Sequence, residues 1–293
     1  MHPYFHFPGR DIPAYGLLMV LAFSLAVSVT LLRTRRKGIP ASEITSFCLM
    51  GIAGAVCGGV FLYGMLNIPV LVQNWDIVAS QPSFWDSLGV ILSIFSGIFY
   101  YGAFIGGLAA MFIYSRKSRA PFFQFIDCIA PALPIAHAVG RIGCLLGGCC
   151  YGVEVRAGHP LSIVYPPESL SAPPGVPLLA VPLIEASCNV VIGLFLLWFA
   201  RREHPPGRVS AVYMMLYAFT RFILEFFRGD AIRGIYAGFS TSQYISVLVG
   251  GAGLALFLAA PGLRRHTGPV WDTFLAEQER LRELKERWKA SRK

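Results

Sequence analysis

Charged residues are scarce in this chain: Asp, Glu, Lys and Arg make up 14% of its 293 residues, against 55% apolar ones. A soluble domain carries about 25% charged residues, so a large aqueous domain is excluded. The sequence has no nucleophile elbow, Walker loop, zincin motif or dinucleotide fingerprint, which leaves hydrolase, kinase and dehydrogenase functions without support. It also has no repeat of fixed period and no low-complexity tract.

Long apolar runs dominate what is present. A helix needs about 20 apolar residues to cross the hydrocarbon core of a bilayer, and the chain has about seven runs of that length. We expect an all-α, polytopic integral membrane protein whose transmembrane helices are residues 12–32, 44–66, 90–114, 122–147, 181–200, 209–227 and 242–260.

Basic residues lie in alternate connections between these runs. Lys and Arg follow the first, third, fifth and seventh runs, whereas residues 67–89, after the second, contain neither. Because Lys and Arg accumulate in short cytoplasmic loops, this pattern predicts an outer amino terminus and a cytoplasmic carboxyl terminus. The expected organisation is a transmembrane domain over residues 1–265, with an external, proline-rich and non-helical insert at 151–180, followed by a charged tail at 266–293.

The basic tail contributes to the formal net charge of +9. Nucleic-acid binding is the weaker explanation of this charge, because basic loops and a basic tail also suit a cytoplasmic membrane surface. Near-helical spacing of apolar residues suggests an amphipathic helix on that surface, through Phe274, Leu281, Leu284 and Trp288. A solvated charged tail is an equal alternative.

Two arginines lie inside apolar runs, and the first is Arg141. An intramembrane guanidinium costs at least about 2.5 kcal/mol, so it is expected to face a polar cavity and bind an anion. His137 lies four residues earlier, on the same face of a helix, and an unperturbed pKa near neutrality suits it to accept a proton. The alternatives are an arginine that reaches the outer headgroups and a histidine bonded to a backbone carbonyl.

The second arginine, Arg221, belongs to a polar stripe. The stripe recurs at intervals of four, four and three residues and consists of Tyr217, Arg221, Glu225 and Arg228. Glu225 can orient both arginines while the stripe keeps a net positive charge for a phosphate. An ion-pair lock between helices is the alternative interpretation.

Two further acidic residues lie in apolar runs, Glu185 near the outer end of one and Asp127 near the inner end of another. Glu185 is the better site candidate, because Arg141 and Arg228 also lie toward the outer half. Asp127 is expected to cap the start of its own helix or to reach toward the inner surface.

Three of the seven cysteines cluster in the sequence: Cys144, Cys149 and Cys150. Thiolates bind soft metals, but this spacing is poor for zinc and offers no obvious fourth ligand, so no metal is expected. A buried cysteine is most often a small apolar side chain. A thiol oxidoreductase that uses Cys149 and Cys150 stays open as an alternative, although the familiar redox pair is Cys-x-x-Cys.

These residues lie in segments that resemble the prolipoprotein diacylglyceryl transferases of bacterial membranes, over nearly the whole chain. The family signature begins Gly-Arg-x-Gly-Asn and closes Glu-x-x-Gly, and GRIGCLLGGCCYG at residues 140–152 matches it at Gly140, Arg141, Gly143 and Gly152. Further landmarks follow in the family's order: Tyr15 in IPAYGL, Gly102 in YYGAFIGG, Pro182 and Glu185 in VPLIEA, and RFILEFFRGD at 221–230.

The resemblance implies a multi-pass enzyme of the bacterial cytoplasmic (inner) membrane, with its amino terminus outside. The implied reaction, the first step of lipoprotein maturation, transfers the diacylglyceryl group of phosphatidylglycerol to the lipobox cysteine thiol of a prolipoprotein and releases glycerol phosphate. The implied partners are phosphatidylglycerol, the prolipoprotein signal peptide and the lipid bilayer, with no cofactor and no nucleic acid. By this resemblance Arg141 holds the phosphate, and Arg221 stabilises charge on the departing phosphate.

The candidate site follows from the residues and the resemblance together. The candidate catalytic residues are His137, Arg141, Arg221 and Tyr101, and the candidate substrate-binding residues are Arg141, Tyr15, Glu185, Tyr217, Glu225 and Arg228.

The chain departs from the family's pattern at four positions: Cys144 stands for the usual asparagine, Cys149 for a glutamate, and Tyr101 and Val181 for two histidines. Since the acceptor thiol must lose its proton, we expect His137 to take the proton-accepting role. The departures leave open a divergent member that acts on another acceptor or is inactive. An anion or lipid transporter is a further alternative, although the sequence has no convincing inverted repeat.

Overall fold

The computed structural model describes residues 4–7, 10–37, 39–95, 97, 99–118, 120–229 and 235–263, with scattered helical residues between 276 and 290. The chain divides into two compact units. The first comprises Met1–Lys37 and Ile126–Arg265, and the second comprises Gly38–Phe125 and His266–Lys293.

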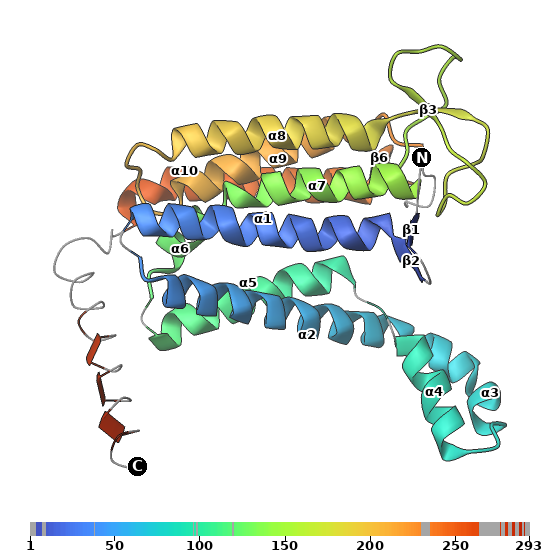
Figure 1. The fold of residues 1–293 in the computed structure, drawn as a ribbon, viewed down its shortest axis with the longest axis horizontal. Coiled ribbons are helices and arrows are strands. Elements are labelled where there is room, and N and C mark those ends of the chain that lie inside the picture. Colours follow the sequence, from blue (N-terminus) through green and yellow to red (C-terminus); the bar gives the residue numbers. More distant parts are fainter. Residues whose placement is uncertain are drawn as a thin grey trace. The chain divides into compact units, whose positions relative to one another are not determined.

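Long helices lie side by side in the first unit (Figure 1): α1 (Ala14–Arg36), α7 (Ala132–Gly147), α8 (Val181–Phe199), α9 (Arg208–Glu225) and α10 (Thr241–Ala259), which ends in the 3-10 turn η1 (Ala260–Gly262). Helix α1 packs on α7, α7 on α8, α8 on α9, and α9 on α10. This order brings together α7, α8 and α9, the three helices that carry the charged candidates.

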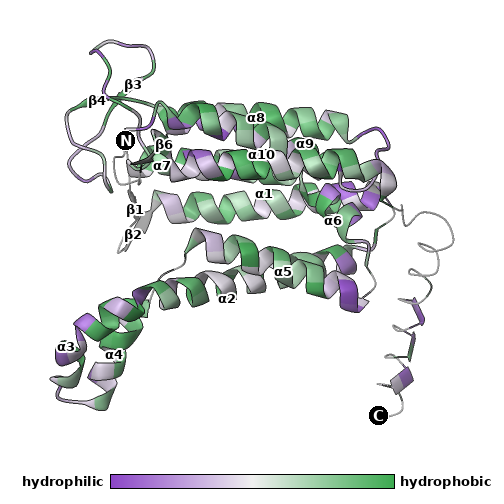
Figure 2. Cartoon of the chain, turned by 180° about the vertical axis from the view of Figure 1, so that it is seen from behind, coloured by the Kyte–Doolittle hydropathy of each residue, from purple (hydrophilic) through white to green (hydrophobic). Residues whose placement is uncertain are grey.

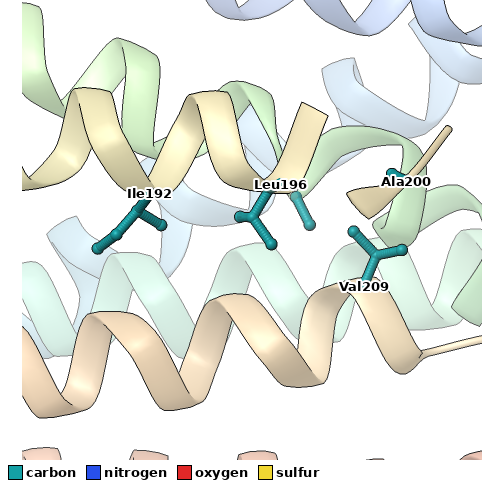
Figure 3. Close-up of a cluster of buried hydrophobic side chains, with 5 residues drawn as sticks. Ile192, Leu196, Ala200 and Val209 are labelled. Carbon is teal, nitrogen blue, oxygen red and sulfur yellow. The ribbon is translucent and has the colours of Figure 1, made fainter. Parts of the chain in front are cut away.

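Apolar side chains hold α8 against α9 at one end of the pair (Figure 3). Ile192, Leu196 and Ala200 pack against Val209 at the start of α9, together with Ala130. Lipid tails are as apolar as these side chains, so close van der Waals packing holds such a pair together in a membrane. Toward the opposite end, the pair also buries polar residues: Glu185, Asn189, Arg221 and Glu225.

The apolar run predicted at 122–147 is not one straight helix. It divides into α6 (Phe122–Ile129) and α7, with a bend of 40° between them. Pro131 causes the break, because it has no N–H to donate and because a residue before proline avoids the α conformation. The expected helix around His137 and Arg141 is confirmed, since both lie inside α7.

Asp127 caps a helix, but not its own. Its carboxylate accepts hydrogen bonds of 2.8 Å from the backbone N–H groups of Gly207 and Ser210, and one of 2.7 Å from the Ser210 hydroxyl. These groups begin α9, whose first N–H groups have no partners within the helix. The prediction that Asp127 caps its own helix or reaches the inner surface is therefore wrong: it is buried and fastens α6 to the start of α9.

The described residues are mostly helical, as the all-α prediction expects, and short two-stranded antiparallel hairpins accompany the helices: β1 (Tyr4–Phe7) with β2 (Arg10–Pro13), β3 (Ser162–Val164) with β4 (Pro177–Leu179), and β5 (Ile235–Tyr236) with β6 (Phe239–Ser240). The strands are too short to produce a period-2 pattern in the sequence. Residues 151–180, where a non-helical insert was expected, contain no helix. This insert is ordered by a buried cluster of Tyr165, Ala172 and Leu178.

The second unit contains α2 (Ala41–Gln73), α3 (Trp75–Ala79), α4 (Phe84–Phe95) and α5 (Tyr100–Ser118). Glycines let α2 and α5 pack closely. A Cβ on Gly58 would lie 2.4 Å from the carbonyl oxygen of Gly102, and one on Gly106 would lie 2.3 Å from that of Gly54. Each helix thus presents two glycines four residues apart, the small-residue pattern that brings helix backbones together in lipid.

The run predicted at 90–114 is interrupted, because α4 ends at Phe95 and α5 begins at Tyr100. Gly97 lies in this break, where a Cβ would lie 2.4 Å from the ring of Tyr63. Among the described residues, α1, α2, α8 and α10 are long and apolar enough to cross a membrane, and the bent α6–α7 pair is a fifth candidate if its two helices form one span.

Hydrophobic residues predominate along these helices (Figure 2), and many of their large apolar side chains are exposed. Phe61 is 69% exposed and Leu248 is 71% exposed. Apolar surface on this scale is rare on soluble monomers, and together with the helix lengths it indicates a multi-pass membrane protein. In the tail, Leu284 and Trp288 are exposed, whereas Phe274 and Leu281 lie outside the described residues, so the amphipathic tail stays a prediction.

Candidate active site

Helix α7 places His137 and Arg141 on one face, one turn apart, as their spacing predicts. The Arg141 Nε–H donates a hydrogen bond of 3.1 Å to His137 Nε2. Because Nε2 accepts this hydrogen bond, the neutral imidazole of His137 carries its proton on Nδ1. The ring of His137 also lies 5.5 Å from the ring of Tyr217 on α9.

Glu185 on α8 joins this pair. Its Oε1 lies 3.0 Å from Arg141 Nη2 and 3.6 Å from His137 Nε2, and the residue is 1% exposed. A carboxylate buried this deeply needs a cation beside it. Arg141 and Glu185 thus form a buried ion pair between two helices, with His137 at its edge.

A second charged cluster lies between α9 and α10. Arg221 Nη2 lies 2.8 Å from Glu225 Oε2 and donates a 3.2 Å hydrogen bond to the Ser242 hydroxyl. Glu225 also accepts a 2.8 Å hydrogen bond from Ser240, whose hydroxyl caps the start of α10 in a capping box with Gln243. Of the predicted stripe, Tyr217, Arg221 and Glu225 lie on α9, where Arg221 and Glu225 are buried against protein, whereas Arg228 follows the helix.

The two clusters interact electrostatically. Arg221 interacts with Glu185, which is paired with Arg141, and also with Arg228. Arg141, Arg221 and Arg228 outnumber Glu185 and Glu225 by one charge, and such an excess in a buried site favours a bound anion. Arg221 keeps a further donor for that anion, since its Nη1 is buried and has no hydrogen-bond partner among the described residues.

Arg228 follows α9 and reaches a different part of the site. Its backbone pairs with Gly152 in an isolated antiparallel bridge. The backbones of these two segments approach closely: a Cβ on Gly229 would lie only 2.3 Å from the carbonyl oxygen of Gly152. Hydrogen bonds from the Cys144 and Cys149 thiols, together with the guanidinium of Arg228, lower the pKa of the Cys150 thiol.

Two candidates stand apart from these clusters. Tyr15 lies near the start of α1, where it packs against Gly143 and interacts electrostatically with Arg141. Tyr101 lies in the second unit, near the start of α5, and its ring is 5.6 Å from that of Phe99. The structure thus gathers eight of the nine predicted site residues in the first unit, and it describes Tyr101 within the second.

Sequence reasoning missed three polar residues of the site, Ser240, Ser242 and Asn189. Asn189 is 1% exposed on α8 and donates a 2.9 Å hydrogen bond to the backbone carbonyl of Glu185. Its position four residues after Glu185, inside an apolar run, was a signal that could have identified it. The two serines carried no such signal, because serine is common at helix starts.

An apolar groove runs between α9 and α10 beside the Arg221 cluster. One part, of about 370 Å³, is lined by Phe222, Phe239, Gln243, Tyr244, Val247 and Leu248. It adjoins a part of about 300 Å³ that is lined by Met215, Ala218, Phe219, Phe222, Ser246, Val247 and Gly250. Gln243 follows Ser242 directly, so the groove begins next to a residue that Arg221 contacts.

Comparison with known proteins identifies the family of this chain. The family model described as prolipoprotein diacylglyceryl transferase matches residues 3–259. The chain is 32% identical over 249 residues to phosphatidylglycerol--prolipoprotein diacylglyceryl transferase 2 of Clostridium perfringens, covering 85% of this chain and 91% of that protein. It is 31% identical to the Clostridium tetani enzyme of that name (85% and 93% covered) and 31% identical to that of Acinetobacter baumannii strain SDF (82% and 85%). The chain therefore belongs to the prolipoprotein diacylglyceryl transferase family.

Proposed function

We propose that this protein transfers the diacylglyceryl group of phosphatidylglycerol to the lipobox cysteine thiol of a prolipoprotein and releases glycerol phosphate. The observation that carries the proposal is the net positive cluster of Arg141, Arg221 and Arg228, of which Arg221 is buried and the other two are partly buried, beside an apolar groove. An anionic headgroup and apolar chains are the two parts of a phospholipid, and this site offers a place for each. The names of the relatives give the same lipid donor, the same transferred group and a prolipoprotein acceptor.

The charge balance of the reaction explains why arginines are needed. The acceptor sulfur forms a bond to the glyceryl carbon, and the bond from that carbon to the phosphate oxygen breaks. The thiolate loses its negative charge, while the phosphodiester, with one negative charge, leaves as a monoester with two. Guanidinium groups fixed in a buried site stabilise the charge that develops on the leaving phosphate.

Arg141 and Arg221 take different parts in this reaction. Arg141 donates a hydrogen bond to His137, one helical turn away, and lies 3.0 Å from Glu185. Binding of a phosphate by Arg141 therefore draws it away from these two partners. Arg221 is held by Glu225 and Ser242 through Nη2, which leaves Nη1 for the substrate. In this proposal Arg141 holds the phosphate, and Arg221 stabilises the departing one.

His137 accepts the thiol proton in this proposal. Its Nε2 lone pair is engaged by Arg141 Nε, and it becomes available when Arg141 turns toward the phosphate. Glu185, at 3.6 Å from Nε2, stabilises the imidazolium that then forms. Substrate binding and release of the base are thereby coupled through one arginine.

Replacing His137 with alanine is expected to lower kcat about 10²-fold, at the low end for a general base because a thiol already ionises near pH 8.5. A rise in pH increases the thiolate fraction without help, so the deficit shrinks above about pH 8.5. The measurement is a pH profile of transfer in membranes, with His137→Gln as a variant that keeps a hydrogen-bond acceptor for Arg141. Full activity of His137→Ala at neutral pH would refute the role.

The groove between α9 and α10 is proposed to hold an acyl chain. Val247→Trp fills the groove where its two parts meet. If about three chain carbons lose contact at about 0.3 kcal/mol each, KM for long-chain phosphatidylglycerol rises about fivefold. A short-chain analogue is expected to lose less. The matched control is Leu258→Trp, on the same helix but outside the groove, and equal effects of both variants would contradict the assignment.

The finer topology is part of the proposal. We infer about seven crossings, with α9 and the α4–α5 segment added to the five candidate spans that length and composition identify. The alternating basic connections support an outer amino terminus and a cytoplasmic carboxyl terminus, and a bacterial inner membrane is part of the same proposal. On that topology the site opens toward the outer leaflet, where a signal-peptide cysteine is presented.

One assay tests the reaction directly. Purified protein is incubated with phosphatidylglycerol and a lipobox peptide, and glycerol phosphate and the mass of the peptide are measured. The expected result is glycerol phosphate together with a peptide that carries diacylglycerol on its cysteine. A peptide with serine in place of that cysteine is the control. Absence of both products with protein that is folded and lipid-bound would overturn the proposed function.

A further inference from the structure

Three thiols lie together where α7 ends. The Sγ atoms of Cys144, Cys149 and Cys150 all lie within 4.8 Å of one another, and the three are free thiols. A tetrahedral zinc ion with Zn–S distances of about 2.3 Å holds its sulfurs about 3.8 Å apart. Side-chain movements of about 1 Å therefore bring these three sulfurs onto one ion.

A turn in the backbone makes this convergence. Gly148 follows α7 with φ = 70°, and the N–H of Cys149 donates a 3.1 Å hydrogen bond back to the carbonyl of Cys144. Cys150 has φ = 58°, a left-handed conformation that is uncommon for a residue with a side chain. Adjacent residues on a helix point about 100° apart. The left-handed turn at Gly148 and Cys150 instead brings the side chains of the adjacent Cys149 and Cys150 to the same place as that of Cys144. The spacing of the cysteines in the sequence does not reveal this convergence.

A buried hydroxyl without a hydrogen-bond partner among the described residues belongs to Tyr165, which packs beside the cluster. Tyr165 as a whole is 1% exposed. The ring packs on the Gly148 turn, where a Cβ would lie 3.1 Å from Tyr165 Cδ1, and the phenol interacts electrostatically with all three thiols. Metal-bound thiolates accept hydrogen bonds from such second groups, which orient the ligands and tune the metal.

The surrounding charge suits a metal with three thiolates. One divalent ion and three thiolates carry one negative charge in total. Arg141 lies one turn before Cys144, and Arg228 interacts with Cys150, so cations are available on two sides. The cysteines themselves are only partly buried, so a fourth ligand can approach from the open side.

We propose that Cys144, Cys149 and Cys150 form a three-thiolate zinc site whose fourth position binds the acceptor cysteine of the prolipoprotein. The spacing in the sequence is poor for zinc, but the three sulfurs converge in the fold, and zinc sites that act in chemistry keep three protein ligands and one open position. This inference rests on the proposed function for the identity of the fourth ligand. The three protein ligands do not depend on it.

Zinc would supply a thiolate at neutral pH. The acceptor thiol releases its proton on coordination, because a metal-bound thiol is deprotonated. Its sulfur then bonds to the glyceryl carbon as the carbon–oxygen bond to phosphate breaks, and the neutral thioether product leaves zinc as a weak ligand. Zinc does not change oxidation state, and His137 takes up the released proton. Arg141, one turn from Cys144, brings the phosphate close to the bound thiolate.

The test begins with metal content, independently of activity. Protein stripped with a chelator under reducing conditions is incubated with zinc, freed of excess metal and analysed by mass spectrometry. We expect about one zinc per wild-type chain and a loss of at least about tenfold in affinity in Cys149→Ser and in Cys150→Ser. Cys188→Ser, on α8 and outside the cluster, is the matched control and keeps the metal. Equal zinc content in all four proteins would overturn the site.

Cobalt then reports on the fourth position. Wild-type protein loaded with Co²⁺ is expected to show thiolate-to-metal absorption that changes on addition of a lipobox peptide and does not change with the serine peptide. No change with the cysteine peptide would overturn the substrate role. An internal disulfide among the three cysteines in protein purified without oxidant, or binding of Cu(I) but not zinc, would overturn the zinc site.

The two proposals fail in different ways. Zinc bound by the three cysteines in a protein that transfers nothing would remove the proposed function and leave the metal site. Full transfer activity by metal-free wild-type protein would leave the function and remove the role of zinc.

Discussion

Arg221→Ala is expected to lower kcat for diacylglyceryl transfer about 10³-fold while the protein still folds and inserts. Loss of one fixed donor to a developing oxyanion costs about 10²–10³-fold, and a guanidinium supplies charge as well as donors. The change also removes the cation that lies 2.8 Å from the buried Glu225 carboxylate, which costs about 3–5 kcal/mol of stability; Glu225 keeps its 2.8 Å hydrogen bond from Ser240, and kcat is therefore compared for folded protein only. The measurement is kcat and KM for phosphatidylglycerol, alongside the unfolding temperature in detergent.

Two further variants sharpen this result. Arg221→Lys keeps the charge but cannot hold Glu225 and a phosphate with one planar group, so activity should recover only in part. Arg201→Ala removes an exposed arginine of the first unit and should leave kcat unchanged. If Arg221→Ala retains more than about one tenth of wild-type kcat, Arg221 does not stabilise the leaving phosphate.

The contacts between charged residues of one helix were predictable from the sequence, because residues four positions apart lie next to each other on a helix. His137 and Arg141, and likewise Arg221 and Glu225, are four residues apart, and each pair is in contact in the structure. The apolar runs also predicted where most long helices lie, because a segment that crosses a membrane must satisfy its backbone hydrogen bonds within itself and therefore forms a helix. Local spacing within one helix therefore carried much of the candidate site.

Contacts between segments distant in the sequence were not predictable in this way. Asp127 reaches the start of α9, some 80 positions away, and nothing in its local pattern reveals that partner. The cysteine cluster depends on left-handed backbone at Gly148 and Cys150, which composition does not specify. Ser242 reaches Arg221 because α10 packs on α9, and that pairing is a property of the tertiary fold.

Arg141→Ala is expected to abolish measurable transfer, with a loss of at least about 10³-fold, for two reasons that must be separated. The phosphate loses a guanidinium, and Glu185, 1% exposed, loses the cation that lies 3.0 Å from it. Removing one partner of a buried ion pair costs about 3–5 kcal/mol of stability, because the remaining charge stays buried. Loss of activity in this single variant therefore does not by itself identify Arg141 as a phosphate ligand.

The double variant Arg141→Met/Glu185→Leu separates the two effects. Replacing both members of a buried ion pair by apolar groups of similar size is often neutral or stabilising, so the unfolding temperature should return close to that of the wild type. Transfer should stay at least about 10³-fold below wild type, because no guanidinium binds the phosphate in the restored fold. Recovery of activity together with stability would mean that Arg141 serves only to pair with Glu185. A stable but inactive double variant would instead place Arg141 on the substrate, since folding could no longer account for the loss.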